Sequence, residues 1–337
     1  MFLNINHLPF IKGYMNRKKT KPLLCRACVI GTIFCFLTSH VLAQETFSIY
    51  RGNDSSYLSS SDRHYTHGIK FIYTFNPSWK WLEDWEKWNK PNEQESATAV
   101  GFFGGQNMFT PDYIDKPEKR NAKDMRYSGH LFNGMFIQKA TQNDFEQMEI
   151  NLGIIGPSSY AEDMQKWWHH TTGAPKPIGW EEQIEDEFTF DFSWQHKHKY
   201  HGWTTLDKLD SDWIIHYGFT AGTVYRHLNF GATYRIGLKL PGDFGPGRID
   251  NYQDFTRKTA APQKSTYFFL RGDGLLVDHN RFYDNLSIEP AVGQLQSGFV
   301  FLWSQFELGI SYAVSTHQFK EQSSYDSFTT VTITYRF

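Results

Sequence analysis

The last ten residues of the chain, Phe328–Phe337, alternate between apolar and polar side chains. Val331 and Ile333 fall on one side of a strand, and Thr332 and Thr334 fall on the other. Since successive side chains of a strand point to opposite faces, the pattern predicts one apolar and one polar face. A strand of this kind that ends in an aromatic residue is typical of the closing strand of a transmembrane β-barrel. An edge strand of a soluble sheet would show the same alternation.

The amino-terminal region has the pattern of a secretory signal peptide. Six basic residues and no acidic residue precede an uncharged apolar run of 16 residues, Ala27–Leu42, which is followed by the small residue Ala43. This order of regions is typical of a cleaved signal, and the apolar run is short for a membrane-spanning helix. We therefore expect residues 1–43 to be removed and residues 44–337 to form the mature chain. A start at Met15 would give the signal a more ordinary length.

Composition limits what the mature chain can be. Cys25, Cys28 and Cys35 all lie in the expected signal, so the mature chain would have no disulfide and no cysteine metal site. Without the signal, 28 Lys and Arg stand against 36 Asp and Glu, and this net charge of −8 argues against a nucleic-acid-binding surface. Aromatic residues make up 17% of the chain although its mean hydropathy is −0.54. A barrel fits both values, because only every second residue of its strands needs to be apolar.

Alternating stretches separated by turn residues recur along the mature chain. They predict an all-β fold, a transmembrane antiparallel β-barrel of about 12 strands with short helical loops. We see no internal repeat and no linker, so we expect one domain. The predicted strands cover residues 46–52, 64–76, 97–109, 127–139, 144–156, 187–198, 212–226, 227–240, 265–279, 286–303, 306–318 and 328–337.

A tryptophan-rich stretch, residues 77–96, breaks the strand pattern. In it Trp81, Trp85 and Trp88 are spaced so that they would share one face of a helix. Such an amphipathic helix would either lie in the membrane interface or cap one end of the barrel. The sequence leaves both alternatives open.

A second helix is predicted from Ser159 to His170, with Ser158 or Ser159 as its N-cap and Glu162 completing a capping box. Gln165 and His169 are four residues apart on this helix, so they project from the same face. A histidine beside a glutamine is a candidate general base oriented by a neighbour. Since the chain has 14 histidines, an ordinary surface histidine is the competing interpretation.

Oxygen-bearing side chains lie where the first two predicted strands meet. Asn53 and Asp54 end the first strand, and residues 61–68, which include Thr66, open the second. Carboxylate, amide and hydroxyl oxygens are the ligands that a hard cation such as Ca²⁺ prefers, although the same residues also form ordinary turns. The chain has no G-x-S-x-G, Walker or H-E-x-x-H motif, so a base-activated water is favoured over a serine nucleophile.

The order of these motifs resembles that of the outer-membrane lipid A 3′-O-deacylase family, LpxR. The resemblance covers most of residues 46–190, and the later strands match in character rather than in motif. The matching segments are Asn53-Asp54, Asp62-Arg63-x-Tyr65-Thr66-x-Gly68, Gly105–Pro111 with Lys116 shortly after, Gly153–Pro157, Gln165-x-x-x-His169 and Gly179-Trp180-x-x-Gln183.

The resemblance implies a twelve-stranded barrel in the bacterial outer membrane that removes the 3′-acyloxyacyl group of lipid A with the help of Ca²⁺. It implies that His169 is the general base that activates water. Asn53, Asp54, Thr66 and Lys116 would be the polar residues of the site, and Asp54, Thr66 and Gln165 would surround the cation. The expected partner is lipid A or lipopolysaccharide in the outer leaflet, and the expected oligomeric state is a monomer.

The chain departs from the family pattern after the second helix. Some members carry an acidic residue and a tyrosine there, at places that fall near Pro175 and Pro177 in this chain. This departure weakens the case for a complete set of cation ligands. Two alternatives therefore stay open beside a lipid A deacylase, namely a non-catalytic barrel that is a pore or a structural protein, and an outer-membrane phospholipase.

Overall fold

The computed structural model divides the chain into two units, Met1–Leu42 and Ala43–Phe337. It describes residues 45–54, 63–82, 84, 97–119, 123–202, 208–247 and 264–337, all of them in the second unit. The expected signal peptide lies outside the described residues. No helix within these ranges is long and apolar enough to cross a membrane.

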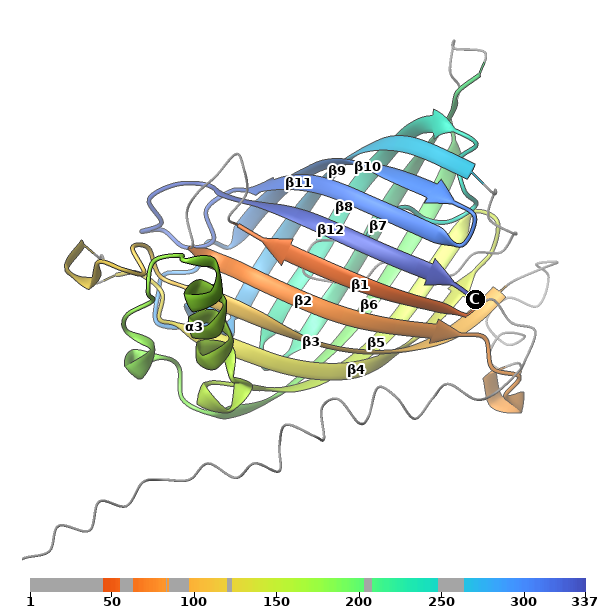
Figure 1. The fold of residues 1–337 in the computed structure, drawn as a ribbon. Helices are drawn as coiled ribbons and strands as arrows, with labels where there is room; N and C mark the ends of the chain where they lie inside the picture. The colour runs from red at the N-terminus through yellow and green to blue at the C-terminus, as the bar shows by residue number, and fades with distance from the viewer. Residues whose placement is uncertain are drawn as a thin grey trace, which may run out of the picture. The chain divides into compact units, whose positions relative to one another are not determined.

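Twelve antiparallel strands form a closed barrel in which each strand pairs with its neighbours along the chain (Figure 1). The predicted fold class and strand number are therefore confirmed. The predicted strand 286–303 starts later, at Ala291, because the 3₁₀ turn Arg281–Tyr283 (η4) is followed by turns and one isolated bridge up to residue 290. The strands are β1 Thr46–Asn53, β2 His64–Phe75, β3 Ala97–Thr110, β4 Ser128–Ala140, β5 Asp144–Ile155, β6 Glu187–His201, β7 Asp210–Gly222, β8 Tyr225–Leu238, β9 Lys264–Asn280, β10 Ala291–Trp303, β11 Phe306–Ser315 and β12 Asp326–Arg336.

The barrel closes between its first and last strands. β1 and β12 pair from Thr46 opposite Arg336 to Asn53 opposite Thr329. Beyond this ladder, the backbone N–H of Phe337 donates to the carbonyl of Glu45 over 3.0 Å. Closure leaves no unpaired strand edge, which is a requirement for a sheet surrounded by lipid.

The polarity of the wall is the reverse of that in a water-soluble sheet. On β12, Thr330, Thr332 and Thr334 are buried and face inward, whereas Ile333 faces outward and is 47% exposed. The alternation predicted for residues 328–337 is thus confirmed, with the apolar side outside. A chain with an apolar exterior and a polar interior suits a barrel in a bilayer.

Ion pairs of two buried arginines lie in the half of the lumen near the carboxyl terminus. Arg235 pairs with Asp212 over 2.6 Å and also with Asp243, which lies in the segment that follows β8. Arg271 of β9 pairs with Asp273 over 2.7 Å and donates to the carbonyl of Pro246 in the same segment. Both of these buried guanidinium groups therefore have a carboxylate partner, which offsets the cost of removing their charge from water.

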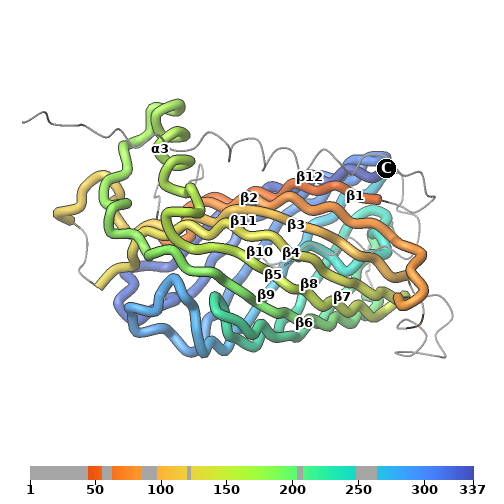
Figure 2. Tube along the Cα trace, turned by 90° about the horizontal axis from the view of Figure 1, so that it is seen from below, coloured from red at the N-terminus to blue at the C-terminus, as the bar shows by residue number. Residues whose placement is uncertain are grey.

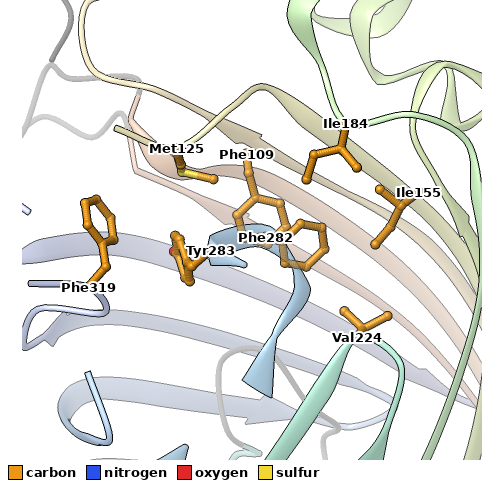
Figure 3. Close-up of a cluster of buried hydrophobic side chains, with 8 residues drawn as sticks. All are labelled: Phe109, Met125, Ile155, Ile184, Val224, Phe282, Tyr283 and Phe319. Carbon is orange, nitrogen blue, oxygen red and sulfur yellow. The ribbon is translucent and has the colours of Figure 1, made fainter. Parts of the chain in front are cut away.

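An apolar cluster fills the opposite end of the lumen (Figure 3). Its members come from the carboxyl ends of odd-numbered strands and from the loops that follow these strands. The rings of Phe109 and Phe282 stack with centroids 3.9 Å apart. A cavity lined by Tyr267, Gln296 and Ser311 has a volume of only about 30 Å³. Apolar side chains therefore occupy this end of the described lumen. The cluster consists of Phe109, Met125, Ile155, Ile184, Val224, Phe282, Tyr283 and Phe319.

Helix α3, Ala161–Thr172, confirms the predicted helix but starts two residues later. The predicted capping by Ser158 or Ser159 with Glu162 is wrong, because the N-cap is Tyr160 in a left-handed conformation with φ 59°. The hydroxyl of Ser159 donates instead to the carbonyl of Gly156, since Pro157–Ser159 form a separate 3₁₀ turn (η2). The remaining 3₁₀ turns are η1 Pro117–Lys119 and η3 Trp180–Glu182.

The tryptophan-rich stretch is described only in part. Residues 80–82 and 84 are helical, and the rings of Trp79 and Trp81 stack with centroids 5.7 Å apart. Trp81 is 52% exposed. Trp85 and Trp88 lie outside the described residues, so the predicted tryptophan face stays a prediction.

Candidate active site on the outer wall

Helix α3 lies against the outside of the barrel wall, at the end opposite the carboxyl terminus (Figures 1 and 2). Its buried residues, Ala161, Gln165 and His169, follow one another at intervals of four and so form one stripe along the helix. Ala161 packs with Met108 of β3. The next residue, Phe109, belongs to the apolar cluster in the lumen, so Met108 points to the outside of the wall. The stripe that carries Gln165 and His169 therefore faces the wall.

A glycine allows the helix to approach the wall this closely. A Cβ atom at Gly129 of β4 would lie 2.2 Å from the Cβ of Ala161 and 2.2 Å from the hydroxyl oxygen of Ser159. Beside it, the amide of Gln106 donates to the carbonyl of Ser159 over 2.6 Å. No larger residue fits at position 129 while α3 stays where it is.

The ring of His169 is held in one tautomer by the chain that follows the helix. Its Nδ1 lies 2.5 Å from the carbonyl oxygen of Pro175, and a carbonyl can only accept a hydrogen bond. Nδ1 therefore carries the proton, and Nε2 of the neutral ring has the lone pair that a general base needs. His170 is exposed, as expected from its place on the helix. Pro175, where the sequence departs from the family pattern, thus orients His169 through its backbone.

Gln165 is fixed by Trp180. The indole Nε1 of Trp180 donates to Oε1 of Gln165 over 2.7 Å, and the Trp180 ring packs on Tyr127 with centroids 4.7 Å apart. Nε2 of Gln165 is buried and has no hydrogen-bond partner within the described residues. The amide oxygen of Gln165, which the resemblance places near a cation, is therefore already engaged.

Asp54 and Thr66 meet at the rim of the barrel where β1 ends and β2 begins. The N–H of Asp54 donates to the carbonyl of Thr66 over 3.3 Å, and Oδ2 of Asp54 accepts the N–H of Arg63 over 2.5 Å. Both side chains are buried, at 4% and 3% exposure. A bulge between Tyr65 and His67 leaves Thr66 outside the regular ladder. The neighbouring Asn53 is half-buried and stays in the ladder with β2 and β12.

The loop after β3 connects the rim to the helix. Thr110 shares a hydrogen bond of 2.6 Å with the hydroxyl of Thr66. Further along this loop, the carbonyl of Ile114 accepts the N–H of Ile178 over 2.8 Å, just beyond the turn that orients His169. Lys116 belongs to the same loop, but its side chain is 51% exposed and its ammonium lies 3.6 Å from Asp115. The loop after β3 therefore contacts both the rim, at Thr66, and the segment that follows α3, at Ile178. The side chain of Lys116 lies at the surface.

His64 is a residue that the sequence analysis missed. It is buried, its Nδ1 lies 2.5 Å from Asp326, and its Nε2 lies 3.7 Å from Asp124. It therefore connects the loop after β3 and the start of β12 to the start of β2, one residue from Arg63. His64 occupies an unmatched place in the motif Asp62-Arg63-x-Tyr65-Thr66, and only its position between two matched residues could have drawn attention to it.

The candidate cation ligands are of the right chemical type but few in number. Across the part of the chain that is described, no three His, Cys, Asp or Glu side chains gather to hold a metal ion. Asp54 and Thr66 offer a carboxylate and a hydroxyl at one place, and both are oxygen donors of the kind that Ca²⁺ prefers. Ca²⁺ takes about six to eight oxygen ligands, so water and other groups would have to supply the rest.

One comparison with a solved structure supports this barrel architecture. LpxR from Salmonella typhimurium is similar in structure, with a TM-score of 0.71 and 18% sequence identity over 87% of this chain and 100% of that chain. The β-domain of the Bordetella autotransporter BrkA has a TM-score of 0.43 and 9% identity over 88% of this chain and 98% of that chain. No curated protein sequence matches the chain. The model of the family described as outer membrane protein LpxR matches residues 28–337, and the chain therefore belongs to this family of bacterial outer-membrane barrels.

Proposed function

We propose that this protein is a lipid A-modifying hydrolase of the outer membrane that removes the 3′-linked acyloxyacyl group of lipid A. His169 is the residue that supports this proposal most directly. It lies in the wall-facing stripe of α3, outside the barrel, and its Nδ1 is bound to a backbone carbonyl. His169 is buried between α3 and the wall, so a lipid from the bilayer would reach it by entering between them, whereas a base in the lumen would lie on the other side of the wall from the bilayer.

In the proposed reaction, Nε2 of His169 removes a proton from a water molecule as the water oxygen attacks the ester carbonyl carbon. The carbonyl oxygen becomes an oxyanion, and the bond to the sugar oxygen then breaks. The proton held by His169 passes to that leaving oxygen. The products are a free carboxylic acid and a sugar hydroxyl, so one water is consumed for each ester.

Asp54 and Thr66, with Asn53 beside them, are the proposed polar residues at the rim. We propose that Asp54 and Thr66 hold a Ca²⁺ ion, which when bound would stabilise the negative charge of the oxyanion. Gln165 is the weakest of the three proposed ligands, because its oxygen accepts from Trp180. Lys116 would serve the oxyanion only if its exposed side chain turned toward the rim.

The packed lumen weighs against the alternative that the barrel is an open pore. Ion pairs occupy one half of the described lumen and the apolar cluster occupies the other. A pore would need a continuous water-filled path between the two ends. A phospholipase would use the same base and differ only in its lipid, so the choice of substrate in the assay separates it from a lipid A deacylase.

The test is mass spectrometry of lipid A incubated with the purified protein, its His169→Ala variant and its His170→Ala variant. We expect the unaltered protein to release a 3′-linked acyloxyacyl group. Loss of the general base in His169→Ala should lower the rate by about 10²–10⁴-fold, and His170→Ala should be close to unaltered. If only His170→Ala loses activity, His170 is the base. Release of acyl chains from glycerophospholipids but not from lipid A would favour the phospholipase.

A further inference from the structure

Arg51 differs from every other arginine in the described part of the chain. Eight arginines are described, and seven of them have a carboxylate within 4.0 Å. Arg51 has no carboxylate partner among the described residues. The seven pairs are Arg63–Asp112, Arg126–Asp284, Arg226–Asp278, Arg235–Asp212, Arg271–Asp273, Arg281–Glu187 and Arg336–Glu307.

The side chain of Arg51 lies on the outside of the barrel. Ser48 of β1 faces the lumen, where its hydroxyl bonds to Thr334, and Arg51 falls on the opposite face by the alternation of the strand. Arg51 is exposed, and its cross-strand neighbours are Ile69 and Val331, which are apolar. An arginine on the lipid-facing side of a barrel is costly unless it lies near the interface or has a partner.

Two uncharged rings hold the guanidinium in place. Nε of Arg51 donates to Nε2 of His67 over 3.4 Å, so that this nitrogen of His67 is an acceptor. The guanidinium carbon lies 5.7 Å from the centroid of the Trp168 ring on α3, within the range of a cation–π contact. Neither contact cancels the positive charge, and both leave the two terminal nitrogens of the guanidinium available.

The position of Arg51 relates it to the candidate active site. Arg51 lies two residues before Asn53 on the same face of β1, about 7 Å away at the usual rise of a strand. The ring that it contacts belongs to Trp168, the residue before His169. Arg51 thus contacts the helix that carries the proposed general base and lies two residues from Asn53 on β1, so it adjoins both parts of the candidate site.

We propose that Arg51 binds a phosphate monoester on the headgroup of the substrate lipid, next to the ester that is cleaved; this rests on the proposed function above. The planar guanidinium donates two parallel hydrogen bonds to phosphate oxygens, which a lipid with an uncharged headgroup cannot accept as strongly. Arg51 is therefore a specificity-determining residue, and it selects lipids by charge before the ester reaches His169.

The experiment compares two lipids and three proteins. The lipids are lipid A with its phosphates and the same lipid after a phosphatase has removed the phosphate monoesters. The proteins are the unaltered protein, Arg51→Ala and Arg226→Ala. Arg226 is a matched control, because it is also exposed, lies at the same end of the barrel at the start of β8, and pairs with Asp278.

We expect the unaltered protein and Arg226→Ala to prefer the phosphorylated lipid by roughly 10- to 100-fold in kcat/KM, as for a charged hydrogen-bonded pair. Arg51→Ala should lose this preference and act on both lipids as the unaltered protein acts on the dephosphorylated one. A preference that survives in Arg51→Ala, or an equal loss on both lipids, would overturn the assignment.

Two further arms separate the sources of phosphate and the two proposals. Inhibition of the unaltered protein by inorganic phosphate that Arg51→Ala does not show would mean that free phosphate also occupies the site. If inorganic phosphate has no effect, the phosphate must be attached to the lipid. If the unaltered protein cleaves neither lipid, the proposed function fails. The role of Arg51 is then tested separately, by measuring the binding of both lipids to the unaltered protein and to Arg51→Ala. Equal binding by the unaltered protein and Arg51→Ala would overturn its role.

Discussion

Replacing Gly129 by alanine should separate activity from barrel folding. The added Cβ would lie 2.2 Å from the Cβ of Ala161 and from the hydroxyl oxygen of Ser159. Two carbon atoms in ordinary contact are about 3.5–4.0 Å apart, so α3 would have to move from the wall by about 1.5 Å. Neither the Cβ of Ala161 nor the hydroxyl oxygen of Ser159 lies at the end of a long flexible side chain that could turn away.

The movement should affect catalysis more than stability. Overpacking of this kind typically costs about 1–3 kcal/mol, which a closed barrel with twelve paired strands should tolerate. His169 lies on the same helical stripe as Ala161 and would move with it. Since a misplacement of about 1 Å can reduce a rate by about 10²-fold, we expect a loss of that order in lipid A deacylation by Gly129→Ala.

Gly104→Ala is the matched control. Gly104 lies on the neighbouring strand β3, and a Cβ there would meet the carbonyl of Phe132 at 3.6 Å and Asn133 at 3.9 Å, which are ordinary contacts. Activity is measured by mass spectrometry of lipid A, and barrel folding by the shift in gel mobility between unheated and heated samples. Full activity in a folded Gly129→Ala would refute the reasoning that links the position of α3 to catalysis.

Two other predictions concern the rim and the lumen. If Asp54 holds Ca²⁺, deacylation should fall in a chelator and return with added Ca²⁺, and excess Ca²⁺ should restore Asp54→Asn only in part; a full rate in chelator would show that the cation assignment is wrong. Asp212→Ala should leave buried Arg235 with Asp243 alone and lower stability by about 3–5 kcal/mol, as for a broken buried ion pair. Its thermal unfolding can be compared with that of Asp278→Ala, which breaks an exposed pair and should change little.

The strands of this barrel could be predicted because their signal is local. An alternation of period two, such as that of Val331 to Tyr335, is set by which face of one strand meets lipid, and it needs no knowledge of the partner strand. The stripe of Gln165 and His169 on α3 follows from the period of the helix in the same way. The family and the membrane location therefore came from the order and period of residues along the chain.

The surroundings of the site were decided by contacts between distant residues. His64 meets Asp326 across 262 positions, and the cation of Arg51 stands out only because the structure gives every other described arginine a carboxylate. The cap of α3 was predicted wrongly because Ser159 bonds within its own turn, where η2 packs on Gly129. The sequence by itself determined which residues face lipid and which face the lumen, since that depends on local period. The tertiary structure decided which charges are paired and how closely α3 approaches the wall, because both depend on chain segments that meet only when the barrel closes.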